Sequence, residues 1–227
     1  KFNIEKNHKK RRLFKRNGFI YDMFLSKDKL VWLEEKLETQ QLCYVPRSEI
    51  DKFKGISAKE IRCQAPVIFP QSLRILGSRT ERDKKGQEQL AELWLQKTDE
   101  TLLGDQYSIL AWNPDTLALK KFHDPYHGKA LSLAFNKQGM FIAYADSNSH
   151  FIRHFDAGGR CLDEQLLGNM VDKLFNNSND QIVMGLWRQE GVLLVRSNLL
   201  PSAKTACKGH DEPTSPLQVS MRYPQAT

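Results

Sequence analysis

Six basic side chains lie within eight residues near the start of the chain, in Lys9-Lys10-Arg11-Arg12 and Lys15-Arg16. Positive charge at this density can neutralise several phosphates and release their counterions, which drives sequence-independent binding to nucleic acid. Neighbouring phenylalanines, Phe2 and Phe14, could stack on bases or enter a lipid interface. We therefore predict a partner-binding or nucleic-acid-binding segment made of Lys9, Lys10, Arg11, Arg12, Phe14, Lys15 and Arg16.

This basic segment accounts for the net charge of the whole protein. The chain has 34 Lys and Arg against 27 Asp and Glu, a net charge of +7. Residues 1–16 hold eight of the basic residues and one acidic residue, Glu5, so the remainder is neutral. Like charges this dense repel, and we expect residues 1–17 to form a flexible arm. Nucleic acid, an acidic protein and an anionic membrane all fit as partners, and so does a solubilising tail that resembles a nuclear import signal.

Histidines and cysteines in the second half raise the question of a metal. His150 and His154 lie four residues apart, and Cys161 follows seven residues later. Cys207 and His210 have C-x2-H spacing. Residues four apart on a strand share a face, so a four-ligand zinc site can be composed from these residues. His154 next to an aromatic-Asp pair and His210 in a Gly-His pair also have structural explanations, and we predict neither a metal nor a cofactor.

A second cluster, KKFHDPYHGK, contains His123, Asp124 and His127. A histidine oriented by a carboxylate can act as a general base, but no nucleophile or second acid can be assigned to it. The motifs GxGxxG, GxSxG and HExxH are absent from the sequence, and with them the common phosphate-binding, nucleophile and zinc-protease signals. We predict that the protein is not an enzyme and has no catalytic residue. Two acidic pairs are expected to be solvated surface: Glu34-Glu35 and Asp99-Glu100.

The four cysteines are far apart in the sequence, at Cys43, Cys63, Cys161 and Cys207. Four cysteines in a chain of 227 residues are too few for a disulfide framework, so we expect reduced thiols in a cytoplasmic protein, with the nucleus as the alternative. No apolar run approaches the roughly 18 residues that a membrane span needs. We therefore expect no integral membrane association.

Short apolar runs separated by polar turns follow the arm, a pattern typical of antiparallel strands. An Asn-Pro-Asp turn predicts a hairpin of QYSILAW and TLALKKF. Between Lys29 and Gln41 strands are favoured over a helix, and QEQLAELWLQ fits either. Further strands are expected in KALSLAF, MFIAYAD, HFIRHFD, MVDKLF, QIVMGLW and GVLLVRS.

These runs contain an internal period. LSLAFNKQGMFIAYAD aligns with VDKLFNNSNDQIVMGLW, which places Phe135-Asn136 over Phe175-Asn176, 40 residues apart. A period of about 40 to 45 residues with four short strands per unit is typical of β-propeller blades. Any antiparallel meander also repeats strand and turn, so this alternative stays open.

The stretch ALSLAFNKQGMFIAYADSNSHFIRHFDAGG resembles one blade of the WD-repeat family. Phe155-Asp156 stands where that family has Trp-Asp, and Trp112-Asn113 resembles the same junction one unit earlier. Gly209-His210 resembles the Gly-His pair that opens a blade. The resemblance covers about residues 106–221, and no unit has both pairs intact. It therefore implies the shape of a blade and leaves the family's Asp–His–Ser–Trp network in doubt.

We thus predict an all-β fold: β-propeller-like, WD-repeat-like antiparallel blades in residues 18–227, preceded by the basic N-terminal arm of residues 1–17. The domain has room for about five units, fewer than a seven-bladed ring, so an incomplete ring, strands from a partner or a smaller open β structure are alternatives. The predicted function is a scaffold subunit that binds other protein subunits in a larger intracellular assembly, with the arm contacting a polyanionic or acidic partner. The alternative is an RNA-binding or DNA-binding component.

Overall fold

The computed structural model describes residues 2–6, 9–14, 18–51, 56, 59–122, 124, 126, 128–145, 149–167, 171–177, 179–188, 191–196 and 207. Within them the fold is all-β, with antiparallel sheets and a single short helix, α1 (Arg47–Asp51). No helix in this described part is long and apolar enough to cross a membrane. The chain divides into two compact units, Lys1–Lys121 and Phe122–Thr227, here called unit 1 and unit 2.

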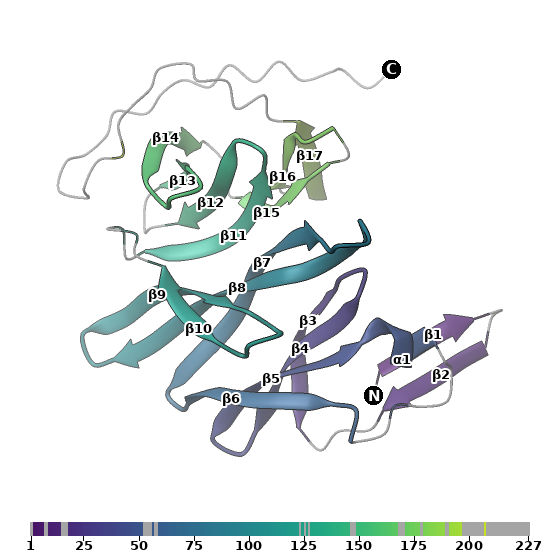
Figure 1. Ribbon diagram of the computed structural model, residues 1–227. Coiled ribbons are helices and arrows are strands. Elements are labelled where there is room, and N and C mark those ends of the chain that lie inside the picture. The colour runs from purple at the N-terminus through teal and green to yellow at the C-terminus, as the bar shows by residue number, and fades with distance from the viewer. Residues whose placement is uncertain are drawn as a thin grey trace. The chain divides into compact units, whose positions relative to one another are not determined.

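Unit 1 contains two four-stranded sheets in which consecutive strands are neighbours (Figure 1). The first sheet comprises β3 (Phe19–Leu25), β4 (Lys29–Lys36), β5 (Thr39–Pro46) and β6 (Arg62–Ile68). The second comprises β7 (Gln71–Arg82), β8 (Glu88–Thr101), β9 (Gly104–Trp112) and β10 (Leu119–Phe122), the last ending one residue past the division. The strand prediction for residues 29–41 is therefore confirmed, and the ambiguous QEQLAELWLQ lies in β8.

The two sheets of unit 1 share one apolar core, because each turns a row of alternate apolar side chains toward the other. Trp112, at the end of β9, is fully buried and meets the Tyr44 ring edge-on at 5.6 Å between centroids. Its indole N–H donates to Gln64 Oε1 at 3.2 Å, so this residue links the two sheets. The core consists of Val31, Leu33, Leu42, Tyr44, Val67, Leu73, Ile75, Leu90, Leu93, Leu95 and Trp112.

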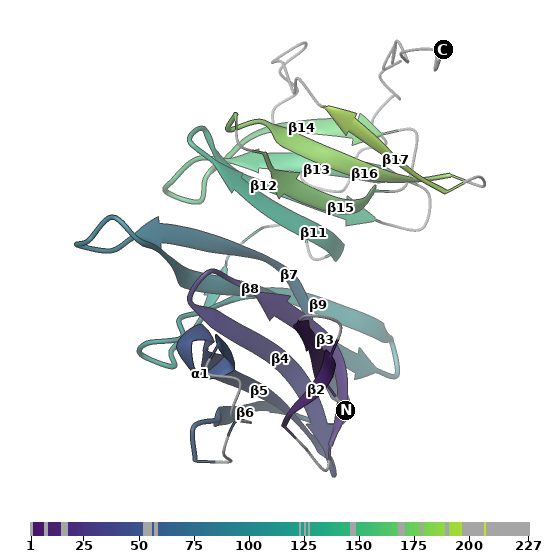
Figure 2. The same cartoon turned by 90° about the vertical axis from the view of Figure 1, so that its right-hand side faces the viewer.

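Unit 2 repeats this arrangement with a four-stranded and a three-stranded sheet (Figure 2). The first contains β11 (Lys129–Asn136), β12 (Gly139–Ala145), β13 (His150–Phe155) and β14 (Cys161–Leu167). The second contains β15 (Val171–Asn176), β16 (Ile182–Arg188) and β17 (Gly191–Arg196). The apolar runs predict each of these strands except β14, in which CLDEQLL places acidic and amide side chains between its leucines.

Asp or Asn side chains close many of the turns by accepting backbone N–H groups further along, as such residues commonly do. Asp156 follows the buried Phe155, and its Oδ1 accepts from the amides of Gly158 and Arg160, both at 2.9 Å. These hydrogen bonds, first that of Arg160, lower the pKa of Asp156. At the Trp112-Asn113 junction, the Asn113 side chain closes the turn in the same way, by accepting hydrogen bonds from backbone amides further along. The residues that close turns in this way are Asp83, Asn113, Asn136, Asp156 and Asn177.

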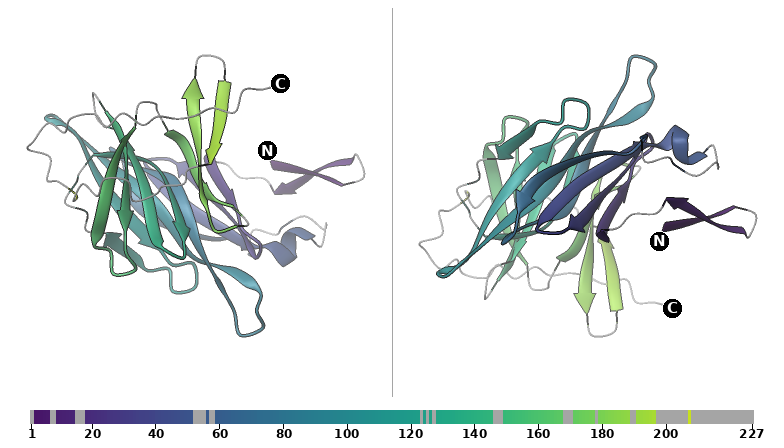
Figure 3. Two further views of the ribbon diagram at one scale, coloured as in Figure 1. Left: turned by 90° about the horizontal axis from the view of Figure 1, so that it is seen from above. Right: turned by 90° about the horizontal axis from the view of Figure 1, so that it is seen from below.

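The N-terminal arm contains a separate two-stranded hairpin, β1 (Phe2–Lys6) with β2 (Lys9–Phe14) (Figure 3). The first five predicted binding residues, Lys9 to Arg12 and Phe14, lie in β2. Lys15 and Arg16 fall outside the described residues. The flexibility of the arm stays a prediction.

The prediction of reduced thiols is wrong, because all four cysteines are paired. Cys43 on β5 and Cys63 on β6 lie directly opposite each other, with their Cα atoms 4.1 Å apart. Cys161 at the start of β14 is bonded to Cys207, with Cα atoms 6.0 Å apart. The partners are 20 and 46 residues apart in sequence, and this spacing does not show the pairing. For Cys43 and Cys63 it is the register of β5 with β6 that brings the two residues together.

We predict that protein unfolded without reductant shows no thiol that iodoacetamide can alkylate, whereas prior reduction yields four. Replacing Cys43 and Cys63 together by serine should lower the free energy of unfolding by roughly 3 kcal/mol, because the unfolded chain loses a cross-link. Peptide mass spectrometry identifies the two bonded pairs. Four alkylated cysteines in unreduced protein would contradict the pairing.

Candidate interaction surface

The turns of unit 1 gather at two ends, because its strands alternate in direction and the β6–β7 turn joins the two sheets at one of them. One end holds the β3–β4, β7–β8 and β9–β10 turns, and we call it the polar end. The other holds the β4–β5, β6–β7 and β8–β9 turns, at the lower left of the unit in Figure 1. We call this second group the apolar end, for its exposed side chains.

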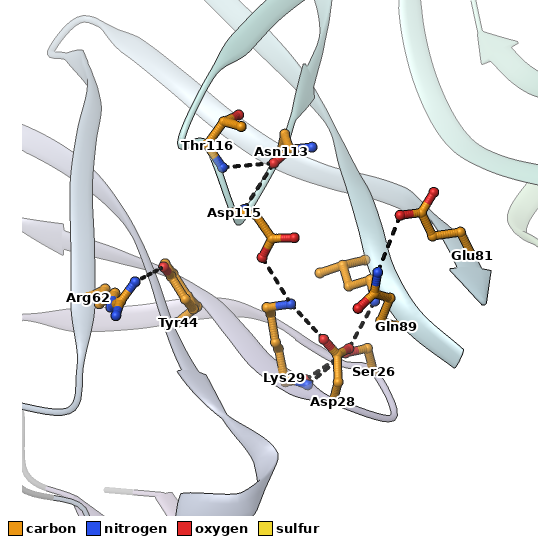
Figure 4. Close-up of polar contacts among 11 residues, drawn as sticks. Ser26, Asp28, Lys29, Tyr44, Arg62, Glu81, Gln89, Asn113, Asp115 and Thr116 are labelled. Carbon is orange, nitrogen blue, oxygen red and sulfur yellow. Dashed lines mark hydrogen bonds and ion pairs between the residues drawn. The ribbon is translucent and has the colours of Figure 1, made fainter. Parts of the chain in front are cut away.

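At the polar end, Asp28 ties the two sheets together (Figure 4). Its Oδ1 accepts hydrogen bonds from the Leu90 amide of β8 at 2.9 Å and from Ser26 Oγ at 2.7 Å. Lys29 Nζ lies 2.6 Å from Asp28 Oδ2 and 3.5 Å from Asp115 Oδ1. Burial opposes ionisation of Asp28, but the hydrogen bonds, first that of Lys29, outweigh it and lower its pKa. The polar groups at this end thus bind one another.

Large apolar side chains occupy all three turns of the apolar end. Leu37, Leu102 and Leu103 are between 91% and 106% exposed, and Phe69 is 74% exposed. Exposed at the adjoining strand ends are Phe19 and Ile68. Single exposed apolar residues are normal on a protein surface, but a group at one end of a domain is typical of an interaction surface.

Turn geometry does not account for these residues. Leu37 has a φ of 56°, in the left-handed region where a residue with a Cβ costs roughly 1–2 kcal/mol. Two-residue hairpin turns favour Asn-Gly, Asp-Gly and related pairs, yet the β8–β9 turn is Leu102-Leu103. These two turns thus have leucine at positions where left-handed and two-residue turns favour other residues.

The apolar end is also acidic. Within three residues of its turn residues, five carboxylates reach the surface, against one basic side chain, Lys36. The five are Glu35, Glu38, Asp99, Glu100 and Asp105. One of the five, Asp99, is ion-paired with Lys97 at 3.1 Å. Glu34 was expected to be solvated, but it is only 1% exposed. Its Oε2 accepts a hydrogen bond from Trp32 Nε1 at 3.3 Å. Such a surface suits a partner that is both apolar and positively charged.

Asp124, considered above as the carboxylate beside a catalytic histidine, belongs to a buried ion-pair network in unit 2. Arg153 Nη1 lies 2.9 Å from Asp124 Oδ1, and Arg153 Nε lies 2.7 Å from Glu164 Oε2. Tyr144 donates its hydroxyl to Asp124, and burial, followed by the charge of Asp124, raises the pKa of Tyr144. Arg153 is 1% exposed, so its guanidinium is enclosed by these carboxylates and links β13 to β14 and to the segment with Asp124.

The zinc ligands considered above do not assemble among the described residues. Cys161 and Cys207 are bonded to each other and supply no thiolate. His154 stacks on Phe141 at 4.3 Å between ring centres, with its Nδ1 3.4 Å from Asp163 Oδ2. Among the described residues, no group of three or more His, Cys, Asp or Glu side chains could hold a metal. His123, His127 and His210 lie outside the described residues.

No family model and no curated protein matches this sequence. Solved structures that match this chain at a distance include a luciferin-regenerating enzyme, with 14% sequence identity and a TM-score of 0.42 over 78% of this chain. The match spans 58% of that enzyme.

Replacing Leu37 by Asn should raise the free energy of unfolding by about 1 kcal/mol, because Asn tolerates the left-handed conformation. Leu102→Asn is the matched control, since Leu102 is equally exposed but is not among the residues with positive φ. Urea denaturation measures both, as a shift in midpoint at constant slope. A destabilised Leu37→Asn protein would show that Leu37 contributes to folding.

Asp28→Asn should lower the free energy of unfolding by about 1–2 kcal/mol near neutral pH, because Lys29 loses the nearer of its two charged partners and keeps only Asp115 at 3.5 Å. The folded-state pKa of Asp28 is lowered, so its contribution is full above the unfolded pKa of about 4 and disappears as pH falls through the folded value. The difference between wild type and variant should therefore shrink in acid. Urea titrations across that range measure it, and a constant difference would contradict the role given to the charge.

Proposed function

We propose that this protein is a non-enzymatic scaffold of propeller-like, WD-repeat-like construction that binds other protein subunits in a larger assembly. The observation that carries the proposal is the apolar end of unit 1. Its exposed leucines and phenylalanine lie in the turns of a rigid pair of sheets, where binding residues of β proteins commonly lie.

The propeller-like architecture is supported by the order of the strands. Each sheet is built from consecutive strands in a meander, and the sheets follow one another along the chain. Neighbouring sheets pack face to face within each unit through shared cores. Propeller blades have this organisation.

The basic arm provides the second contact, to a polyanionic or acidic partner through Lys9, Lys10, Arg11, Arg12, Phe14, Lys15 and Arg16. Its charge supports this role, since eight of its first sixteen residues are Lys or Arg. The same charge supports the alternative, binding of RNA or DNA.

The expected cytoplasmic or nuclear location depended on reduced thiols. Two disulfides favour an oxidising compartment instead, and we propose that the protein works there. The assembly it serves would then lie in the same compartment.

Affinity purification of the tagged full-length chain tests the scaffold. We expect protein partners that bind the wild type and are lost with Leu102→Lys/Leu103→Lys, because the added positive charges oppose both apolar contact and a positively charged partner. Lys84→Glu/Lys85→Glu, in the exposed β7–β8 turn, is the control and should retain them. Equal recovery by all three proteins would contradict the proposal. Recovery of RNA or DNA instead, lost on Lys10→Glu/Arg11→Glu, would support the alternative.

A further inference from the structure

We propose that Asn176, the last residue of strand β15, is a glycosylation site that carries an oligosaccharide on its side-chain nitrogen, Nδ2. The proposal rests on the oxidising compartment given above with the proposed function. It does not depend on which surface binds other subunits.

The residues that follow Asn176 complete an acceptor motif. N-linked glycans are attached at Asn-x-Ser or Asn-x-Thr, where x is any residue except proline. Asn176-Asn177-Ser178 matches this motif, and no other asparagine in the sequence does. Ser178 lies outside the described residues and enters the argument by its residue type alone.

Asn176 lies where a bulky group can be attached without disturbing the core. It is exposed at the end of β15, opposite Ile182 of β16. The turn between these strands is closed by the next residue, Asn177, whose Oδ1 accepts hydrogen bonds from the amides of Asn179 at 2.9 Å and Gln181 at 3.0 Å. The structural role in the turn therefore belongs to Asn177, and Asn176 is left at the surface.

The side chain of Asn176 can take a sugar and keep its hydrogen bond. Nδ2 donates to Asp180 Oδ1 at 3.1 Å, and a side-chain amide has two N–H donors. In the transfer, Nδ2 forms a bond to C1 of the first sugar while the bond from C1 to the diphosphate of a lipid-linked oligosaccharide breaks. The lipid diphosphate departs, and Nδ2 gives up one proton. The second N–H remains available to Asp180.

The disulfides favour a compartment in which this modification takes place. Disulfides form and persist in the lumen of the endoplasmic reticulum and outside the cell, and the Asn-x-Ser/Thr motif is an acceptor in secreted proteins. The bond between Cys161 and Cys207 lies in unit 2, which also contains Asn176. The acceptor and an oxidised cysteine pair are thus in the same compact unit and share its compartment.

A glycan on Asn176 would keep one end of unit 2 free of other subunits. The backbone amide of Lys137, in the β11–β12 turn, donates to Asp180 Oδ2 at 3.1 Å. Because Asp180 also binds Asn176, the β11–β12 and β15–β16 turns meet beside the acceptor. N-linked oligosaccharides are bulky and solubilising, so one attached here would cover both turns. The subunit contacts of the scaffold would then lie on other surfaces.

Peptide mass spectrometry of the full-length protein, purified from the cells that produce it naturally, tests the proposal. Peptide N-glycosidase removes an N-linked oligosaccharide and converts its asparagine to aspartate. We expect a glycan on the peptide that contains Asn176 before treatment and aspartate at position 176 afterwards. On a denaturing gel, the treated protein should migrate faster than the untreated protein.

Variants produced in the same cells assign the site. Asn176→Gln and Ser178→Ala should each abolish the gel shift, because they remove the acceptor nitrogen and the hydroxyl of the motif. Ser178→Thr preserves the motif, is the matched control and should retain the shift. Unmodified Asn176 in a protein with both disulfides would overturn the proposal and leave the scaffold function standing. Unmodified Asn176 together with free thiols would overturn the oxidising compartment as well.

Discussion

Burial of one face of each sheet against its neighbour is the interaction on which the rest of the structure depends. In unit 1 this contact fixes the β6–β7 connection and so decides which turns share an end. The contact between the two sheets is strengthened where side chains of the first sheet accept hydrogen bonds from backbone amides of β7. Asp22 accepts from the Ile75 amide at 2.9 Å, and Gln40 accepts from the Leu73 amide at 2.6 Å. With these amides bound, the turns are positioned as a group.

The pattern of short apolar runs between polar turns was enough to predict most strands, because inner strands such as β4 and β12 are buried on both faces. It failed at β14, where Glu164 is drawn inward by Arg153 and interrupts the pattern. The internal repeat of about 40 residues was only partly visible in the sequence, because the segments that form the sheets differ in length. The first strands of the four sheets begin at residues 19, 71, 129 and 171, so the interval of about 40 holds between the last two. The repeat that begins at β7 is lengthened by its 12-residue and 14-residue strands, β7 and β8. The repeat that begins at β3 is lengthened by the segment that contains α1.

Long-range contacts were beyond the reach of sequence patterns. Asp124 is 29 residues from Arg153, and no local sequence pattern shows that its carboxylate is bound by Arg153 and Tyr144. The disulfide of Cys43 with Cys63 likewise depends on the pairing of β5 with β6. Composition correctly placed the charge of the protein in its arm, because local charge density needs no knowledge of the fold.

The apolar end could not be recognised from hydropathy, because a leucine in a turn and a leucine in a core look alike in sequence. The register alone places Leu37, Phe69 and Leu102 between strands. Once they are placed, the polar end of the same unit supplies the comparison: there, Ser26, Asp28 and Asp83 close turns of the same sheets with hydrogen bonds. The polar end has exposed leucines too, Leu25 at 57% and Leu117 at 38%. The two ends therefore differ in degree, because the four most exposed large apolar side chains of the described residues lie in the turns of the opposite end.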